Sequence, residues 1–153
     1  MPLQDKIPQP VVLFYLISLD ALLDGLDPSL RTAIAMVEKQ VSVRSNEIVF
    51  DSKDLPLQIY IHRRGQVALF QEGELKDIAF PCPAGPRCIY GLVEALSGTS
   101  YGATMKTLSA SKFDVIDRDE FLRLIRDQPT LSFRLAEILS RLCQQSLNAI
   151  RSH

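Results

Sequence analysis

The sequence predicts a single α+β domain in which many short strands, arranged as a sandwich or small barrel, lie between helical segments. Three observations support this class. Apolar residues recur at helical spacing before residue 40, and they alternate with polar residues in short runs between residues 41 and 117. Turn residues interrupt those runs often, which is typical of a sandwich or barrel. Residues 130–150 contain no Gly or Pro and predict one long helix.

Two helices are predicted in the N-terminal part of the chain. A short one covers Leu19–Leu23, and a longer one lies within residues 26–39. Asp27 is the expected N-cap of the second helix, with Pro28 at its first helical position. Three apolar residues then follow at helical spacing: Leu30, Ile34 and Val37.

Seven or eight short strands are predicted in the middle of the chain. Residues 57–71 contain two β-rich runs on either side of Arg64-Gly65, and we expect these runs to form a hairpin. The other signals, in chain order, are alternating Val41, Val43, Ile48 and Phe50, a turn at Gly73, a strand in 76–80, a proline-rich loop in 81–86 and strand-like alternation in 107–117.

Helical spacing returns at Asp117, which has the spacing of a capping box with Glu120 and begins a helix that ends before Pro129.

The long helix that follows carries two adjacent apolar stripes, and a helix packed on one surface needs only one. We therefore expect one stripe to contact the domain and the other a partner helix; the sequence leaves open which does which. The first stripe is Leu135, Ile138, Leu142 and Ala149, interrupted by Gln145, and the second is Leu139, Cys143, Ser146 and Ile150.

The composition excludes several classes of function. With 46% hydrophobic residues, 23% charged residues and a net charge of −1, the chain is an ordinary globular sequence with no basic excess for a nucleic acid. The arginines do not form a run, so we interpret them as solvated positions rather than a phosphate track: Arg63, Arg64, Arg123, Arg126, Arg134 and Arg141.

Metal and nucleophile motifs are missing from the sequence. Cys82 and Cys88 do not have zinc spacing, Cys143 is distant, and an odd number of cysteines argues against a disulfide scaffold. His62 is the one histidine inside the chain and is expected to be a strand or turn residue. No nucleophile elbow or Walker loop occurs. We therefore expect no metal, no cofactor and no enzymatic activity.

The apolar run Val11–Ile17 is too short to span a bilayer, which requires about 20 residues. It lacks a signal-peptide cleavage site as well. We expect a cytoplasmic protein with an N-terminal extension over residues 1–18 and one domain over residues 19–153.

A glycine-rich stretch, residues 90–105, is the candidate effector pocket. Glycine-spaced loops often hold phosphates with backbone N–H groups, but this stretch contains no Lys or Arg. Its candidate pocket residues are Gly91, Leu92, Glu94, Tyr101, Gly102 and Ala103.

Three segments in this order resemble the cyclic-nucleotide-binding domain of the Crp/Fnr regulators. Residues 19–37 resemble its N-terminal helices, residues 58–70 its strand–Gly–strand signature with Gly65 at the turn, and residues 113–142 its last strand and C-terminal helices. The resemblance covers Leu19 to Ile150. It implies a cyclic-nucleotide-binding-like double-stranded β-roll, or jelly roll, flanked by N-terminal helices and a long C-terminal helix.

The resemblance places the glycine stretch at the family's phosphate-binding cassette, but both polar anchors differ. Leu92 stands where nucleotide-binding members have the Glu for the ribose hydroxyl, and Tyr101 stands where they have the Arg for the cyclic phosphate. A buried phosphodiester requires a charge partner or several donors. We therefore predict a degenerate regulatory or interaction domain that does not bind cAMP or cGMP tightly. The alternative is a sensor that binds a cyclic nucleotide or another small effector through Gly91–Ala103.

The Gly-hydrophobic start of the cassette resembles the oxygen-sensing Fnr branch, but the N-terminal cysteine cluster of that branch is missing. The sequence ends at His153, so we expect no helix-turn-helix and no direct DNA binding. Crp/Fnr proteins pair through the long helix, so the resemblance implies a homodimer, alongside a possible protein partner. The candidate dimer residues are Leu135, Ile138, Leu139, Leu142, Cys143, Ser146 and Ile150.

Overall fold

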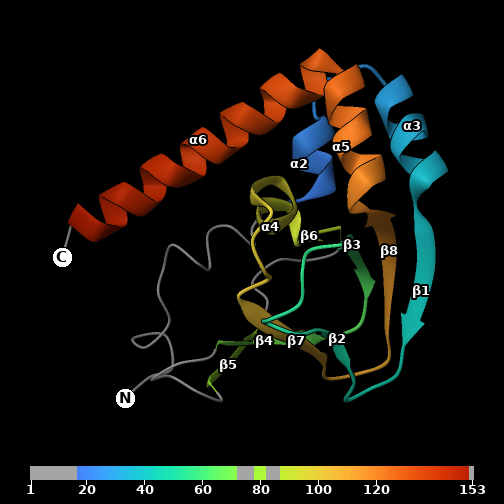
Figure 1. Ribbon diagram of the computed structural model, residues 1–153, viewed down its shortest axis with the longest axis vertical. Coiled ribbons are helices and arrows are strands. Elements are labelled where there is room, and N and C mark those ends of the chain that lie inside the picture. The colour runs from blue at the N-terminus through green and yellow to red at the C-terminus, as the bar shows by residue number, and fades with distance from the viewer. Residues whose placement is uncertain (1–16, 72–77, 82–86, 152–153) are drawn as a thin grey trace.

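The computed structural model describes residues 17–71, 78–81 and 87–151 (Figure 1). Its first helix, α2 (Leu19–Leu23), is capped by Ser18, whose Oγ accepts a hydrogen bond from the Ala21 N–H at 3.1 Å. The second, α3 (Ser29–Val37), begins one residue later than the sequence predicts, since Pro28 is its N-cap. The Asp27 carboxylate still accepts from the Ser29 N–H at 2.9 Å, so the predicted capping residue supports the helix start from one position further away.

Eight short strands in the described part of the chain form two four-stranded antiparallel sheets, which confirms the predicted jelly-roll class. The strand order is β1-β8-β3-β6 in the first sheet and β2-β7-β4-β5 in the second. The strands are β1 (Lys39–Val43), β2 (Ile48–Phe50), β3 (Gln58–Arg64), β4 (Val67–Gln71), β5 (Ile78–Pro81), β6 (Ile89–Tyr90), β7 (Ala103–Thr107) and β8 (Ser111–Asp117).

The predicted hairpin between residues 57 and 71 is wrong. β3 pairs with β6 and β8, whereas β4 pairs with β5 and β7, so the chain crosses from one sheet to the other at Gly65. Gly65 has a φ of 93°, and a Cβ there would overlap Ser111 Oγ. The glycine is therefore required by a close approach to the start of β8. The predicted turn at Gly73 lies outside the described residues, as does the predicted loop 81–86 except for Pro81, which is the last residue of β5.

Two apolar cores stabilise the fold. One lies between the sheets and includes Phe50, Tyr60, Leu69, Tyr90, Tyr101, Met105 and Phe113. The other lies between the helices and the first sheet, where Ile59, Ile61, Ile89 and Ile116 contact helical residues such as Leu22, Leu30, Phe121 and Leu131. β3 contributes to both cores because alternate side chains of a strand point to opposite faces.

Two helices close the domain, α5 (Arg118–Asp127) and α6 (Pro129–Arg151). α5 begins after Asp117, as predicted, but the capping box does not form. The Asp117 side chain makes no capping hydrogen bond; it pairs with Lys39 at 3.6 Å, and Glu120 pairs with Arg123 at 3.2 Å. In Figure 1, α6 runs from the group of helices at the top of the view toward the lower left.

Candidate functional site

The glycine stretch forms a short helix with a left-handed residue at each end. Helix α4 (Leu92–Ser97) is preceded by Gly91 at φ 87° and followed by Gly98 at φ 75°. The Gly98 N–H donates to the Glu94 carbonyl at 2.7 Å and closes the last turn. Positive φ is strained for residues with a Cβ. The glycines at these two positions are therefore explained by the backbone alone, without a ligand.

Tyr101 occupies the interior of the β-roll. Tyr101 is 5% exposed, and its ring stacks on that of Phe50 with the ring centroids 4.2 Å apart. The hydroxyl donates to the Gln58 carbonyl at 2.6 Å and accepts from the Gln58 N–H at 3.4 Å. Burial raises the pKa of the phenol above its ordinary value, so the group stays neutral. A neutral, fully engaged phenol thus stands where the resemblance places a cationic anchor.

Gly91 and Tyr101 are in direct contact. A Cβ at residue 91 would lie 2.9 Å from Tyr101 Cε1 and 3.2 Å from the Gln58 carbonyl oxygen. Because Gly91 has no side chain, the Tyr101 ring can occupy the space beside its Cα.

The candidate pocket residues do not all face one interior. Tyr101 and Ala103 belong to the core between the sheets, whereas Leu92, which is 2% exposed, belongs to the core beneath the helices. Glu94 is half-buried in α4, and Gly102 is exposed with its N–H donating to the Ser52 carbonyl at 2.9 Å. A glutamate at position 92 with this side-chain direction would point into apolar surroundings.

Sequence reasoning missed the residues that surround the Tyr101 ring. Phe50, Gln58 and Tyr60 come from strands more than 40 positions away, and the Tyr60 hydroxyl donates to Gln58 Oε1 at 3.0 Å. Alternation within β2 and β3 places these side chains on a buried face. Nothing in the sequence indicates that the same face receives Tyr101.

His62 is a buried strand residue, in the kind of position that the sequence predicts. Its Nε2 lies 3.1 Å from the Arg64 carbonyl oxygen, and its ring contacts Phe113 with centroids 5.5 Å apart. Burial lowers the pKa of the imidazole below its ordinary value. Within residues 17–71, 78–81 and 87–151, no three His, Cys, Asp or Glu residues gather into a possible metal site.

Both predicted stripes of the long helix contribute to the domain core. Leu135 and Leu142 are buried in it, and Ile138 and Leu139 pack against it, whereas Cys143 is exposed. The side chains of Ser146, Ala149 and Ile150 lie outside the described residues. One face of α6 is open, and we call it the open face; it shares Cys143 with the second predicted stripe. Its residues follow heptad spacing and are all exposed: Phe133, Ala136, Ser140, Cys143 and Leu147.

Comparison with known families adds the decisive observation. Residues 40–128, more than half of the chain, match the model of the cyclic nucleotide-binding domain. The chain belongs to this family. The Crp/Fnr-like fold predicted from the sequence is thereby confirmed.

Solved structures of this fold superpose on most of the chain. The catabolite activator protein of Thermus thermophilus has a TM-score of 0.74 at 20% identity, over 86% of this chain and 62% of that one. The sensor domain of the transcriptional regulator DNR from Pseudomonas aeruginosa gives 0.69 at 17% identity, over 84% and 86%. The N-terminal domain of a transcriptional regulator from Streptomyces coelicolor gives 0.70 at 16%, over 84% and 90%.

The chain thus spans less than two thirds of the catabolite activator protein's length. A comparison with curated protein sequences finds no match. In the described part of this cyclic nucleotide-binding domain, no helix is both long and apolar enough to cross a membrane.

Proposed function

We propose that this chain is a non-catalytic regulatory module, a cyclic nucleotide-binding domain that has lost tight binding of cAMP and cGMP and acts through protein contacts. The observation that carries the proposal is the Tyr101 side chain, which fills the interior between Phe50 and Gln58. A nucleotide entering there would have to displace a stacked ring and break the hydrogen bond to the Gln58 carbonyl. Displacement without replacement leaves that partly buried acceptor without the phenol donor, which is costly.

Electrostatics supports the same proposal. Residues 91–103 contain no Lys or Arg. Arg118 lies at the C-terminal end of α4, where its Nε donates to the Ala95 carbonyl at 2.7 Å. A phosphodiester monoanion in this site would lose its water without gaining a cation from residues 91–103.

Contacts through α6 are the second part of the proposed function. The open face carries exposed Phe133 and Leu147 at its two ends, with small residues between them. Small residues let two helix backbones approach closely, and each aliphatic side chain buried at such a seam contributes about 1.5–3 kcal/mol before association costs. We propose that this face pairs two copies of the chain, which then present a joint surface to a protein partner.

A thermal-shift screen with cyclic nucleotides and a metabolite set tests the ligand part of the proposal. A ligand at a hundred times its Kd stabilises the folded state by about 2.7 kcal/mol, which shifts the melting temperature by several degrees in a domain of this size. We expect cAMP and cGMP at about 1 mM, a hundred times a Kd of 10 μM, to leave the melting temperature unchanged. A shift of that size with either nucleotide would contradict the proposal. A shift with another metabolite that binds through Gly91–Ala103 would favour the alternative sensor function.

A further inference from the structure

A second concave surface lies on the outer face of the sheet β1-β8-β3-β6. The helices cover the apolar half of that face, where Ile61 and Ile116 are buried. The other half is open and forms a cleft of about 440 Å³. Its lining residues are Gln40, Val41, Ser42, Arg63, Arg64, Arg87, Lys112, Phe113 and Asp114.

The cleft concentrates positive charge in a chain whose net charge is −1. Four of its lining residues are cationic and Asp114 is the lining carboxylate. A second carboxylate, Glu38, lies close enough to interact with Asp114, Arg63 and Arg87, so the excess positive charge of the cleft rests on Arg64 and Lys112. Arg64 and Lys112 face each other across the β3–β8 pair and are both exposed. Among the described residues, neither side chain has an ion-pair partner, so the cleft presents two uncompensated positive charges.

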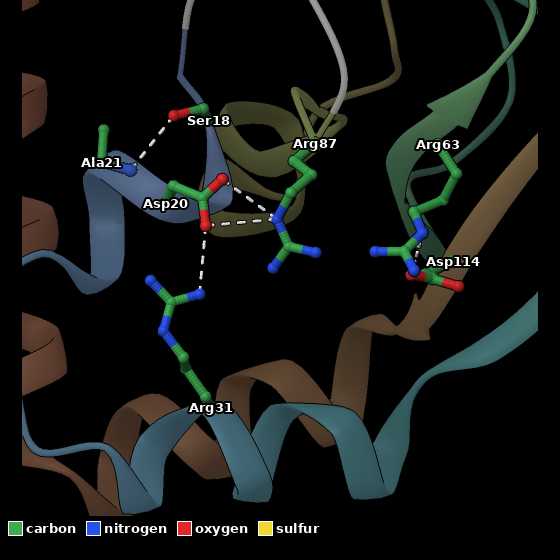
Figure 2. A network of polar contacts seen from close by, with 7 residues as sticks. All are labelled: Ser18, Asp20, Ala21, Arg31, Arg63, Arg87 and Asp114. Atoms are coloured by element: carbon green, nitrogen blue, oxygen red, sulfur yellow. Dashed lines mark hydrogen bonds and ion pairs between the residues drawn. The ribbon is translucent and has the colours of Figure 1, made fainter.

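The other two cations are held in place by carboxylates. Arg63 Nε lies 3.2 Å from the buried carboxylate of Asp114, and Arg87 Nε lies 3.1 Å from Asp20. Asp20 also pairs with Arg31 at 3.0 Å and therefore serves two guanidinium groups (Figure 2). Because each of these cleft arginines is bound through Nε, its terminal NH₂ groups remain as donors for an incoming anion.

The backbone of Arg87 is fixed in an unusual conformation. Its φ is 71°, one of two positive values at residues other than glycine in the described part of the chain. The Arg87 N–H donates to the His62 carbonyl at 2.5 Å, and its carbonyl accepts from the Leu19 N–H at 2.8 Å. Positive φ is unfavourable for arginine, and these two hydrogen bonds hold the side chain over the cleft despite that cost.

Charge and size together define the ligand class. A phosphomonoester is a dianion near neutral pH and matches the two uncompensated charges of Arg64 and Lys112. Guanidinium groups fit phosphate oxygens in a forked geometry. The cleft volume lies in the range of small-molecule sites, and the aliphatic stems of the arginines offer apolar surface to the organic part of such a ligand.

We propose that this cleft binds a small phosphomonoester, with Arg64 and Lys112 supplying the unpaired charge and Arg63 and Arg87 supplying oriented donors. The site is separate from the β-roll interior, so it does not depend on the proposed loss of cyclic-nucleotide binding. Through this cleft the module would bind an anionic effector on the face of the first sheet that points away from the β-roll interior.

Titration of ¹⁵N-labelled protein with phenyl phosphate at constant ionic strength tests the proposal. We expect saturable shifts of the amides at 40–42, 63–64, 87 and 112–114. Benzoate, which has the same ring but one negative charge, is expected to bind at least about tenfold more weakly, since it matches only one of the two charges. Shifts that sodium chloride reproduces would overturn the site.

Two charge-matched double variants locate the binding. Arg64→Gln with Lys112→Gln removes two exposed charges from the cleft and is expected to weaken phenyl phosphate binding by about tenfold or more. Arg123→Gln with Arg126→Gln removes two exposed charges from α5 and is expected to change it less than about twofold. Equal losses in both variants would overturn the proposal, as would binding of a hexaglutamate peptide in the cleft without binding of phenyl phosphate. Shifts at residues 91–103 in addition to those of the cleft amides would contradict the filled interior but leave the cleft proposal standing, whereas shifts absent from both regions would overturn the cleft proposal alone.

Discussion

Tyr101 joins the glycine-rich stretch, residues 90–105, to β3 through a single hydroxyl group. Tyr101→Phe keeps the ring on Phe50 but leaves the Gln58 carbonyl, now 2.6 Å from the hydroxyl, without this donor. We expect the free energy of unfolding to fall by about 1–2 kcal/mol, the cost of leaving a partly buried polar group without its partner. Urea denaturation followed by circular dichroism measures it.

Tyr60→Phe is the matched control. The Tyr60 hydroxyl donates to the Gln58 side-chain oxygen at 3.0 Å, and that half-exposed amide can turn to water instead. The expected loss is about 0.5 kcal/mol. If Tyr60→Phe costs as much as Tyr101→Phe, the phenol at position 101 does not have the structural role argued for it.

His62 makes stability depend on pH. Burial lowers its pKa in the folded state, so the unfolded chain binds a proton first as the pH falls. The stability from neutral His62 is complete above about pH 6.5 and is lost between that value and the lower folded pKa. We expect the stability of the wild type to fall relative to that of His62→Gln as the pH drops from about 7.5 to 5.5. Parallel pH profiles for the two proteins would refute this.

At the scale of elements, helix α4 depends on the glycine that precedes it. Gly91→Ala meets both a positive φ and the Tyr101 ring, whereas Gly102→Ala meets a φ of 74° with no atom within 4 Å of the new Cβ. We expect losses of about 2–4 kcal/mol for Gly91→Ala and about 1–2 kcal/mol for Gly102→Ala. Denaturant unfolding of the two variants gives the comparison, and equal losses would mean that the contact with Tyr101 carries no energy.

Helix α6 allows a paired test of the dimer. Leu147 is 45% exposed on the open face, and Leu135 is 4% exposed in the domain core. Leu147→Glu is expected to give a folded monomer with stability changed by about 0.5 kcal/mol or less, whereas Leu135→Glu buries a charge and should unfold the domain. Size exclusion with light scattering and circular dichroism report both properties. A monomeric wild type at about 200 μM, where micromolar association would be saturated, would rule out the dimer.

The sequence predicts the elements well where local rules decide them. Apolar spacing locates α2, α3 and α6, and Pro129 separates α5 from α6 as expected. Local rules fail where distant segments compete. β3 and β4 look like a hairpin around Gly65, but β8 and β7 provide their partners. The Asp117 carboxylate pairs with Lys39 and does not complete a capping box.

In the whole molecule, the candidate site also depends on contacts between distant segments, which the sequence alone does not reveal. The sequence identifies Leu92 and Tyr101 as departures from the family's anchors, because that comparison requires only position. It does not reveal that Leu92 packs beneath the helices while Tyr101 packs between the sheets. Which core a side chain enters depends on how α4 is placed relative to the helices and to the two sheets. No local pattern encodes that arrangement.

The outer cleft also becomes visible only in three dimensions. Arg64 and Lys112 are 48 positions apart in the sequence and adjacent in the sheet, and Arg87 reaches the same cleft from the segment before β6. In the sequence, each of these residues is an isolated charged residue that nothing links to the others. The pairing of β3 with β8 gathers them into one surface.

Isothermal titration of the wild-type protein with cAMP and with cGMP tests the central claim most directly, because it asks whether an interior filled by Tyr101 admits the family's ligand. We expect no saturable heat for either nucleotide in the micromolar range. A single-site isotherm with a Kd below about 10 μM, equivalent to about −7 kcal/mol, would contradict it.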